Sequence, residues 1–294
     1  MGKLKKRKMG ILLVIGVCIL LGALFVWIGW GNSALETTYI NLDILPGDEK
    51  IVIAQVSDLH NAQFGPENET LLKMLEDTKP DEIVVTGDLI DSRKTDFDIA
   101  ENFLRRAQEI AHVTYVTGNH EARIQMDFSQ WESKIHGLNV SVLHNQSEIR
   151  EINGVALQII GLDDPTFGTE EALYIQPEKW IEKTLDALLP RKGQSQEKTI
   201  KILLAHRPEY IQVYEQFDVD LVLSGHAHGG QIRLPFLGGV YAPGQGFFPE
   251  YDSGLYHGSD GNSDTALVVS RGLGNSLFPW RVNNRPELVV IQLT

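Results

Sequence analysis

Five short apolar runs in this chain are each followed, within three residues, by a cluster of Asp, Asn or His side chains. The runs cover residues 51–56, 83–85, 113–116, 202–204 and 221–223. Nearly continuous apolar runs of this length are typical of strands buried on both faces. Segments with helical spacing at 69–78 and 98–110 separate the first three runs, and this β-α-β-α-β order predicts a parallel sheet with right-handed crossovers. Since ligand sites in such sheets form at the carboxyl ends of the strands, we expect the five clusters to lie together.

The five clusters carry donor atoms that divalent metal ions bind. They read Asp58-Leu59-His60, Gly87-Asp88-Leu89-Ile90-Asp91, Gly118-Asn119-His120-Glu121, His206 and Gly225-His226-Ala227-His228. Carboxylate, amide oxygen and imidazole together suit hard or borderline cations. Asp58 and His60 are two apart at a strand end and project to the same side, and Asp88 follows a glycine that lets the backbone turn tightly. Two neighbouring ions stabilise both the attacking and the leaving oxygen at phosphorus, so the pattern predicts a two-metal phosphoesterase.

The order of these clusters across residues 51–233 resembles the calcineurin-like metallophosphoesterase family. The block 225–231 and the tail from Arg271-Gly-Leu-Gly to Arg285-Pro286-Glu287 are similar to its membrane-associated bacterial YkuE/YaeI-type branch, so the resemblance covers nearly all of residues 50–294. It implies an α/β fold, a four-layer α-β-β-α sandwich of two mixed sheets flanked by helices, preceded by one transmembrane helix.

The resemblance also implies a role for each residue of the site. Ion one takes Asp58, His60, Asp88 and His228, and ion two takes Asp88, Asn119, His206 and His226. A hydroxide that bridges the ions attacks phosphorus. His120 then protonates or polarises the leaving oxygen, and Asp91 accepts a hydrogen bond from His120 and orients it. Glu121 is interpreted as a local hydrogen-bonding partner. The cofactors are two divalent ions, for which Mn, Fe and Zn are all suitable.

Other side chains are interpreted by residue type. Arg207, Arg271 and Arg281 are expected to bind substrate phosphate, because a guanidinium offers a fork of donors. The aromatic residues Phe247, Phe248, Phe278 and Trp280 are expected to pack in the core, with an apolar wall for a lipid or sugar as the alternative. The remaining histidines, His112, His136, His144 and His257, are expected to have surface or core roles.

The N-terminal segment predicts a membrane anchor. Residues 1–10 hold five basic residues and no acid, and residues 11–30 hold no charge. About 20 apolar residues suffice to span a bilayer, and the basic cluster predicts a cytoplasmic N-terminus with the catalytic domain outside the cell membrane. A cleaved signal peptide is the alternative, since Asn32-Ser33-Ala34 offers a small residue at a cut site. We expect a tether at 31–49, the metallophosphoesterase domain at 50–294, and an exposed loop at 191–198.

The charge and the cysteine content limit which kinds of partner and substrate are expected. The formal net charge is −13, and the first ten residues contribute +5, so the remainder carries −18. This surface disfavours duplex nucleic acid and broad adhesion to anionic lipid. Cys18 is the only cysteine, so the domain forms no internal disulfide. The expected substrate is a phosphodiester, pyrophosphate or phosphomonoester in a lipid-linked or cell-envelope molecule. Alternatives are a UDP-sugar-lipid pyrophosphatase and a non-catalytic metal-binding envelope protein.

Overall fold

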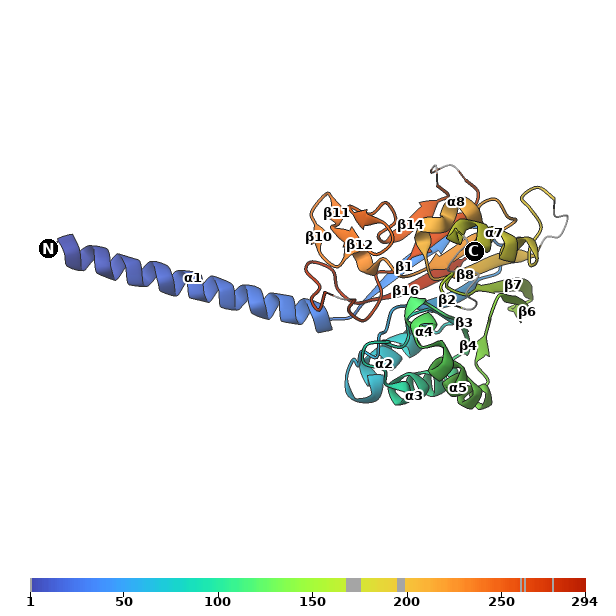
Figure 1. Ribbon diagram of the computed structural model, residues 1–294, viewed down its shortest axis with the longest axis horizontal. Coiled ribbons are helices and arrows are strands. Elements are labelled where there is room, and N and C mark those ends of the chain that lie inside the picture. Colours follow the sequence, from blue (N-terminus) through green and yellow to red (C-terminus); the bar gives the residue numbers. More distant parts are fainter. Residues whose placement is uncertain (1, 168–175, 195–198, 260, 262, 277) are drawn as a thin grey trace.

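Two six-stranded sheets stacked face to face form the centre of the molecule. The computed structural model (Figure 1) describes residues 2–167, 176–194, 199–259, 261, 263–276 and 278–294. Helices α2 (Glu69–Thr78), α3 (Phe97–Gln108) and α5 (Gln125–Ile135) cover one sheet, and α7 (Pro177–Asp186) and α8 (Ile211–Tyr214) cover the other. This is the four-layer α-β-β-α arrangement that the sequence predicts.

Both sheets are mixed. The first has the order β1-β16-β2-β3-β4-β5, from Glu36–Leu42, Glu287–Leu293, Ile51–Val56, Glu82–Thr86, His112–Val116 and Ser141–Val142. The second has the order β14-β15-β9-β8-β7-β6, from Gly254–His257, Ala266–Val269, Leu221–Ser224, Ile200–Ala205, Val155–Leu162 and Gln146–Ile152. Strands β2 to β5 are parallel, as are β7, β8, β9 and β15. The five predicted strand ends therefore come from the parallel part of each sheet.

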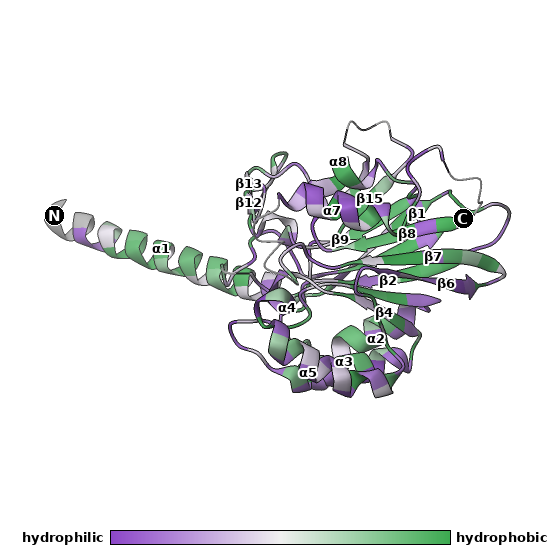
Figure 2. Ribbon diagram, turned by 45° about the vertical axis from the view of Figure 1, so that its right-hand side comes forward, coloured by the Kyte–Doolittle hydropathy of each residue, from purple (hydrophilic) through white to green (hydrophobic). Residues whose placement is uncertain are grey.

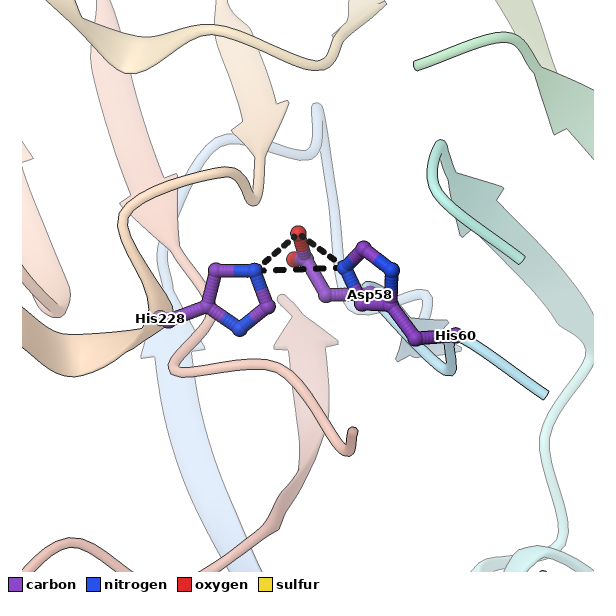
Figure 3. A group of neighbouring side chains, drawn as sticks. All are labelled: Asp58, His60 and His228. Atoms are coloured by element: carbon purple, nitrogen blue, oxygen red, sulfur yellow. Dashed lines mark hydrogen bonds and ion pairs between the residues drawn. The ribbon is translucent and has the colours of Figure 1, made fainter. Parts of the chain in front are cut away.

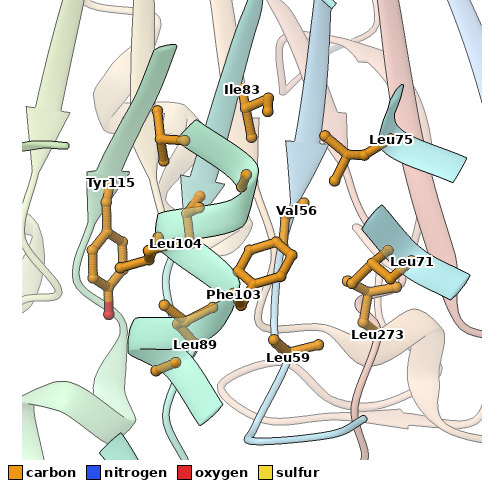
Figure 4. Packing of buried hydrophobic residues seen from close by; sticks show 14 of the residues in the cluster. Val56, Leu59, Leu71, Leu75, Ile83, Leu89, Phe103, Leu104, Tyr115 and Leu273 are labelled. Atoms are coloured by element: carbon orange, nitrogen blue, oxygen red, sulfur yellow. The ribbon is translucent and has the colours of Figure 1, made fainter. Parts of the chain in front are cut away.

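Successive side chains of a strand point to opposite faces of its sheet and so pack into two different layers. On β2, Ile51 and Ile53 point between the sheets, whereas Ala54 and Val56 pack under the helices. Figure 4 shows the second kind of contact, with Phe103 of α3 packed among side chains of the first sheet. Full burial of a side chain of this size contributes about 1.5–3 kcal/mol. The central strands are buried on both faces, which explains why their sequences are mostly apolar.

The expected tether contains a strand. Residues 36–42 form β1, which pairs in parallel with β16 at the edge of the first sheet. Arg271 binds both Glu36 and Glu287, and so connects the start of β1 to the start of β16. The folded domain thus begins at Glu36, not near Lys50. Most side chains of this edge strand are only partly buried, so apolar and polar residues do not alternate clearly along it. The sequence therefore resembles that of a linker.

An apolar helix precedes the domain. Helix α1 spans Gly2–Ser33, and its segment Arg7–Ser33 is long and apolar enough to cross a membrane by length and composition. Figure 2 shows this helix as a hydrophobic rod that projects from the body. Its end is attached to the loop before β16, where Asn32 and Arg281 exchange two hydrogen bonds between the Asn32 amide and the Arg281 backbone.

Two short hairpins lie between β9 and β14. They comprise β10 (Arg233–Leu234) with β11 (Gly238–Gly239), and β12 (Tyr241–Ala242) with β13 (Gly246–Phe247). Their aromatic residues were expected in the core, and this expectation is wrong. Phe247 and Phe248 are exposed, as are Phe278 and Trp280 in the loop before β16. The four side chains lie in a short hairpin and in a loop, outside the two sheets that enclose the core.

Candidate metal centre

The polar clusters meet at the carboxyl ends of the parallel strands. Asp58 follows β2, Asp88 follows β3, and Asn119 begins the short helix α4 (Asn119–Arg123) after β4. From the second sheet, His206 follows β8 and His226 follows β9. All are buried. The two sheets therefore contribute to one site, as the sequence predicts.

The backbone at this site is unusual. Five of its residues adopt a positive φ: Asp58 at 51°, His60 at 47°, Asp88 at 51°, His226 at 64° and His228 at 48°. Residues other than glycine rarely occupy this region, and each such residue costs about 1–3 kcal/mol. Strain of this kind persists where the surroundings force it, and it is concentrated at functional sites. Here it turns the side chains after each strand toward a common point.

One group of converging side chains contains Asp58, His60 and His228 (Figure 3). The Nε2 atoms of the two histidines lie 3.3 Å apart, and Nε2 of His228 lies 3.4 Å from Oδ1 of Asp58. Burial lowers the pKa of His60 to about 3 and that of His228 well below its usual range, so both imidazoles are neutral. Two neutral rings and a carboxylate that face one another present lone pairs to a shared point, which suits a cation.

A second group contains Asp88, His206 and His226. Nε2 of His206 lies 3.3 Å from Oδ2 of Asp88 and 3.2 Å from Nδ1 of His226. The side-chain amide of Asn119 also lies against this group, with one end 2.8 Å from Nδ1 of His226 and the other beside Arg123. With the Asn119 oxygen toward His226, two acceptors face each other, and a cation between them would satisfy both.

Asp88 lies between the two groups. Its Oδ2 atom is 3.3 Å from Nε2 of His206 and 3.6 Å from Nε2 of His60. Its Oδ1 atom accepts a 2.7 Å hydrogen bond from the backbone N–H of His120. Although burial raises the pKa of this carboxyl, the attraction of His206 outweighs it and holds the pKa well below the usual range. Asp88 is therefore ionised, in the position that a bridging ligand requires.

A hydrogen bond to the backbone orients the ring of His206. Its Nδ1 atom lies 2.8 Å from the carbonyl oxygen of Thr86, so Nδ1 carries the proton and Nε2 faces Asp88. Burial by itself lowers the pKa of His206, but the Asp88 carboxylate raises it to about 10. A cation beside Nε2 competes directly with that proton. The tautomer and the second hydrogen bond match those of metal-ligating histidines.

Glu121 supports the turn that carries Asp88. Its carboxylate accepts hydrogen bonds from the backbone N–H groups of Asp88, Ile90 and Gly118 at 2.8–3.0 Å. Burial raises the pKa of this carboxyl to about 7. The sequence interpretation of Glu121 as a hydrogen-bonding partner agrees with this geometry. It ties the ends of β3 and β4 together at the site.

His120 faces the cavity with one defined tautomer. Its Nδ1 atom lies 3.0 Å from the backbone N–H of Ser92, which can only donate, so Nδ1 accepts and Nε2 carries the proton. Burial lowers the pKa of His120 below its usual range, so the ring is neutral near pH 7. His120 thus offers an N–H donor from Nε2.

Asp91 lies beside His120, but its carboxylate is bound mainly by Arg93. Its Oδ1 atom is 3.3 Å from Nδ1 of His120, while its carboxylate accepts three hydrogen bonds from Arg93 at 2.8–2.9 Å. The backbone amide of Ser92, not Asp91, is therefore the primary group that orients the ring. His60, Asp91 and His120 also converge. Because Arg93 already neutralises Asp91, this third group is a weaker place for an ion.

The three arginines singled out from the sequence are separated in the structure. Arg207 binds Asp164, with Nε 2.6 Å from Oδ2, and its Nη1 lies 3.4 Å from Nε2 of His226. Arg271 binds Glu36 and Glu287, away from the two ligand groups. Arg281 is fully buried, and its Nη2 lies 3.4 Å from Nδ1 of His228.

A cavity of about 210 Å³ opens over the two groups. It is lined by Asp88, Arg93, Asn119, His120, Arg123, His226, His228, Pro243 and Ser276. Arg271 and Arg281 instead line a second cavity, of about 230 Å³, at the junction with α1. The guanidinium groups that line the cavity over the two ligand groups are thus Arg93 and Arg123, which sequence reasoning missed. The sequence did contain an indication of them, since each follows Asp91 or His120 by no more than three residues.

The glycine before His226 permits the close approach of the two sheets. A Cβ atom on Gly225 would overlap Ser57 Oγ and Asp58 Oδ2. We expect Gly225→Ala to displace Asp58 and to weaken divalent metal binding about 10–100-fold, as loss of ligand positioning does. Titration of metal content against free Mn²⁺ measures this. Gly137→Ala is the control, since a Cβ there meets nothing within 4 Å. Equal affinities of the two variants would contradict the prediction.

His144 lies outside the site, where it bridges two acids. Nδ1 is 2.8 Å from Asp163 and Nε2 is 3.0 Å from Glu132. Burial lowers its pKa, but these hydrogen bonds outweigh burial and raise it to about 10. Its folded pKa exceeds the ordinary value of about 6.5, so the bridge stabilises fully below pH 6.5 and is lost as the pH rises toward 10.

We therefore expect the wild type to lose about 2 kcal/mol more unfolding free energy than His144→Gln between pH 6.5 and pH 10. Urea unfolding at a series of pH values measures the difference. Parallel stability curves for the two proteins would show that His144 is not charged in the folded state.

The fold and the converging donors define a metal-dependent phosphoesterase, and comparison with known proteins places it in a family. The model of the calcineurin-like phosphoesterase family matches residues 51–230. The chain belongs to this family, and it is therefore a metallophosphoesterase, a hydrolase of phosphoric esters.

Three relatives illustrate the similarity. The chain is 29% identical to the metallophosphoesterase YkuE of Bacillus subtilis, over 92% of each chain. It is 26% identical to the phosphodiesterase YaeI of Escherichia coli, over 81% of this chain and 80% of that one. It is also 28% identical to a bovine transmembrane protein with a metallophosphoesterase domain, over 84% of this chain and 54% of the relative.

Proposed function

We propose that the chain is a membrane-anchored phosphoesterase that holds two divalent ions and hydrolyses a phosphodiester, pyrophosphate or monoester bond of a lipid-linked or cell-envelope molecule. The observation that carries the proposal is the pair of converging donor groups on either side of Asp88. Asp58, His60, Asp88 and His228 would hold one ion, and Asp88, Asn119, His206 and His226 the other. Such ions, when bound, lower the pKa of water and stabilise charge at phosphorus.

The side chains around the cavity supply the remaining chemistry. Arg123 and Arg93 line it. Arg123 would bind the non-bridging phosphate oxygens, since guanidinium groups recognise phosphate through paired donors, and Arg93, whose Nε and Nη2 donate to Asp91, would add its remaining N–H groups. His120 presents its Nε2–H to the cavity and would donate to the leaving oxygen as the ester bond breaks. In this proposal Asp91 acts as a positioning residue, through its contact with His120 and its binding of Arg93. Arg207 lies beside His226 and would help to keep that ring neutral, because burial and the charge of Arg207 hold the pKa of His226 well below its usual range.

Anchoring is the second part of the proposal. The segment Arg7–Ser33 spans about 40 Å as a helix, more than the roughly 30 Å of a bilayer's apolar core. Five basic residues at its start favour a cytoplasmic N-terminus, with residues 36–294 on the outer side. The chain's similarity to a protein named as transmembrane supports the anchor over a cleaved signal.

The test uses the full-length protein in detergent micelles. Hydrolysis of bis-p-nitrophenyl phosphate should require added Mn²⁺, Fe²⁺ or Zn²⁺, and the purified protein should hold two ions per chain. His257→Asn, an exposed histidine on β14, is the control and should keep full activity. Bound metal without turnover on any phosphomonoester, diester or sugar-lipid pyrophosphate would instead identify a non-catalytic metal-binding protein.

A further inference from the structure

A band of exposed apolar side chains surrounds one side of the metal cavity. We call this band the apolar rim. It consists of Phe236, Leu237, Phe247, Phe248, Phe278 and Trp280. Phe236 and Phe247, the most exposed of its aromatic side chains, have relative accessibilities of 107% and 74%. Soluble domains rarely expose so many large apolar side chains together, and such patches mark interaction surfaces.

Contacts connect the segments that carry the rim. Its first four residues belong to the two hairpins, and its last two belong to the loop before β16. Gln231 joins these segments, because its side chain donates a 3.0 Å hydrogen bond to the carbonyl of Phe278. A bridge between Ile232 and Val282 adds a second connection. The hairpins and the loop therefore present their aromatic residues as a unit.

The backbone holds two of these aromatic residues outward. Phe236 has a φ of 69° and Phe248 a φ of 54°. A positive φ in a bulky aromatic residue is an outlier that costs free energy. The same rings could not reach the core without repacking the hairpins. Exposure of the rim is thus a property of the local fold.

The rim adjoins the end of the membrane helix. The rings of Phe25 and Trp280 lie 6.2 Å apart in an edge-to-face contact, and Trp280 in turn contacts Phe278. Figure 1 places hairpins β10–β11 and β12–β13 at the end of the body from which α1 projects, and Figure 2 shows β12 and β13 at that end. An apolar surface that is continuous with a transmembrane helix meets the same solvent as that helix, which is lipid.

The rim also borders the opening of the metal cavity. Pro243, between β12 and β13, and Ser276, close to Phe278, both line that cavity together with His120 and His228. The two segments that carry the rim therefore also form part of the cavity wall. A lipid surface against the rim would place the cavity at the level of the head groups.

We propose that the apolar rim inserts into the interface of the bilayer leaflet from which α1 emerges, and that this turns the metal cavity toward phosphate esters in that leaflet. Trp, Phe and Leu side chains on one face of a surface segment are favoured at the boundary between head groups and acyl chains, and the rim consists of these residue types. The contact is apolar, because a domain with a net charge of −18 beyond residue 10 is repelled by anionic lipid. This inference rests on the anchor in the proposed function and adds a second membrane contact to it.

The test measures the depth of single sites in the full-length protein. Cys18→Ser removes the native thiol, and Phe236→Cys or Phe247→Cys then carries an environment-sensitive fluorophore. The matched control is Ile149→Cys on β6, exposed at 72% and distant from α1 in Figure 1. In phosphatidylcholine vesicles that contain nitroxide-labelled lipid, we expect quenching at 236 and 247 to be at least twofold greater than at 149.

Equal quenching at 236, 247 and 149 would overturn the proposal. A fluorophore at 236 that becomes shielded from water without being quenched by lipid would also overturn it, in favour of contact with a second copy of the chain. Failure of the protein to float with the vesicles would reject the anchor instead. None of these readouts requires catalytic activity, so they are independent of whether the site hydrolyses phosphate esters.

A second measurement connects the rim to substrate. The double variant Phe236→Ser/Phe247→Ser should keep the wild-type rate on bis-p-nitrophenyl phosphate. It should lose about tenfold in kcat/KM on a long-chain phosphodiester presented in vesicles. Equal loss on both substrates would indicate damage to the fold, and no loss on either would overturn the role of the rim. Absence of activity in every protein, wild type included, would reject the proposed function and leave the depth measurement unaffected.

Discussion

Asp88→Asn should lower kcat on bis-p-nitrophenyl phosphate by about three orders of magnitude, equivalent to about 4 kcal/mol of transition-state stabilisation. It should also reduce bound metal from two ions per chain to one or fewer. Asp88 lies between the two donor groups, 3.6 Å from Nε2 of His60 and 3.3 Å from Nε2 of His206. An amide has one carbonyl oxygen and no charge, so it cannot serve both ions.

The same substitution elsewhere provides the control. Asp98 lies in the first turn of α3 and is exposed, so Asp98→Asn should keep both ions and full activity. Circular dichroism of Asp88→Asn checks that the fold is retained. The fold should survive, because the variant removes a buried negative charge that, in addition to burial, raises the pKa values of Asp58 and Glu121. Two bound ions and a near-normal kcat in Asp88→Asn would show that this carboxylate does not bridge.

The sequence predicted the centre of the fold and the meeting of its polar clusters because both depend on local patterns. A strand buried on both faces is mostly apolar, and β2, β3, β8 and β9 each contain a run of at least three apolar residues. Parallel strands place their carboxyl ends at one edge. Asp58 and His206 could therefore be brought together without knowledge of any long-range contact, since each directly follows such a strand.

Features that depend on long-range pairing were not predicted. Strand β1 is stabilised by its partner β16, which lies some 250 residues later in the chain, and by the Arg271 ion pairs. The sequence of β1 alone gives little indication of this pairing. The exposure of Phe247, Phe248, Phe278 and Trp280 was not predicted for a related reason, because apolar type alone favours burial. These side chains lie in a short hairpin and in a loop outside the two sheets, which only the folded structure shows.

The arginines illustrate a different limit. Arg207, Arg271 and Arg281 were chosen for their neighbours in sequence, yet Arg207 and Arg271 are neutralised by nearby carboxylates. Arg93 and Arg123 reach the cavity because the loops that carry them turn over the site after β3 and β4. Ion pairing does not separate the two sets, because Arg93 is itself paired with Asp91, so the path of these loops in the folded chain decides which guanidinium groups line the cavity.

His120→Ala should have an effect that depends on the leaving group. Nε2 of His120 carries a proton because the Ser92 amide occupies Nδ1, so the ring can donate to the departing oxygen. Alkoxide leaving groups are strongly basic and need this donor, and kcat on an alkyl phosphodiester should fall about 10²–10⁴-fold. The p-nitrophenolate anion is a weak base that leaves unaided, so on that substrate the loss should be less than about tenfold.

His120→Gln separates donation from packing, because its amide nitrogen can lie near the position of Nε2. We expect it to retain about tenfold more activity than His120→Ala on the alkyl diester, since one hydrogen bond contributes about 1.5 kcal/mol. Metal content should be unchanged in both variants. A uniform loss on alkyl and nitrophenyl esters would place His120 in binding of the phosphate, whereas a loss of metal would place it among the ligands. A loss confined to alkyl esters requires a proton donor at the leaving oxygen. Within the described residues three histidines line the cavity, and of these His226 and His228 belong to the ligand groups on the two sides of Asp88, which leaves His120 as the donor.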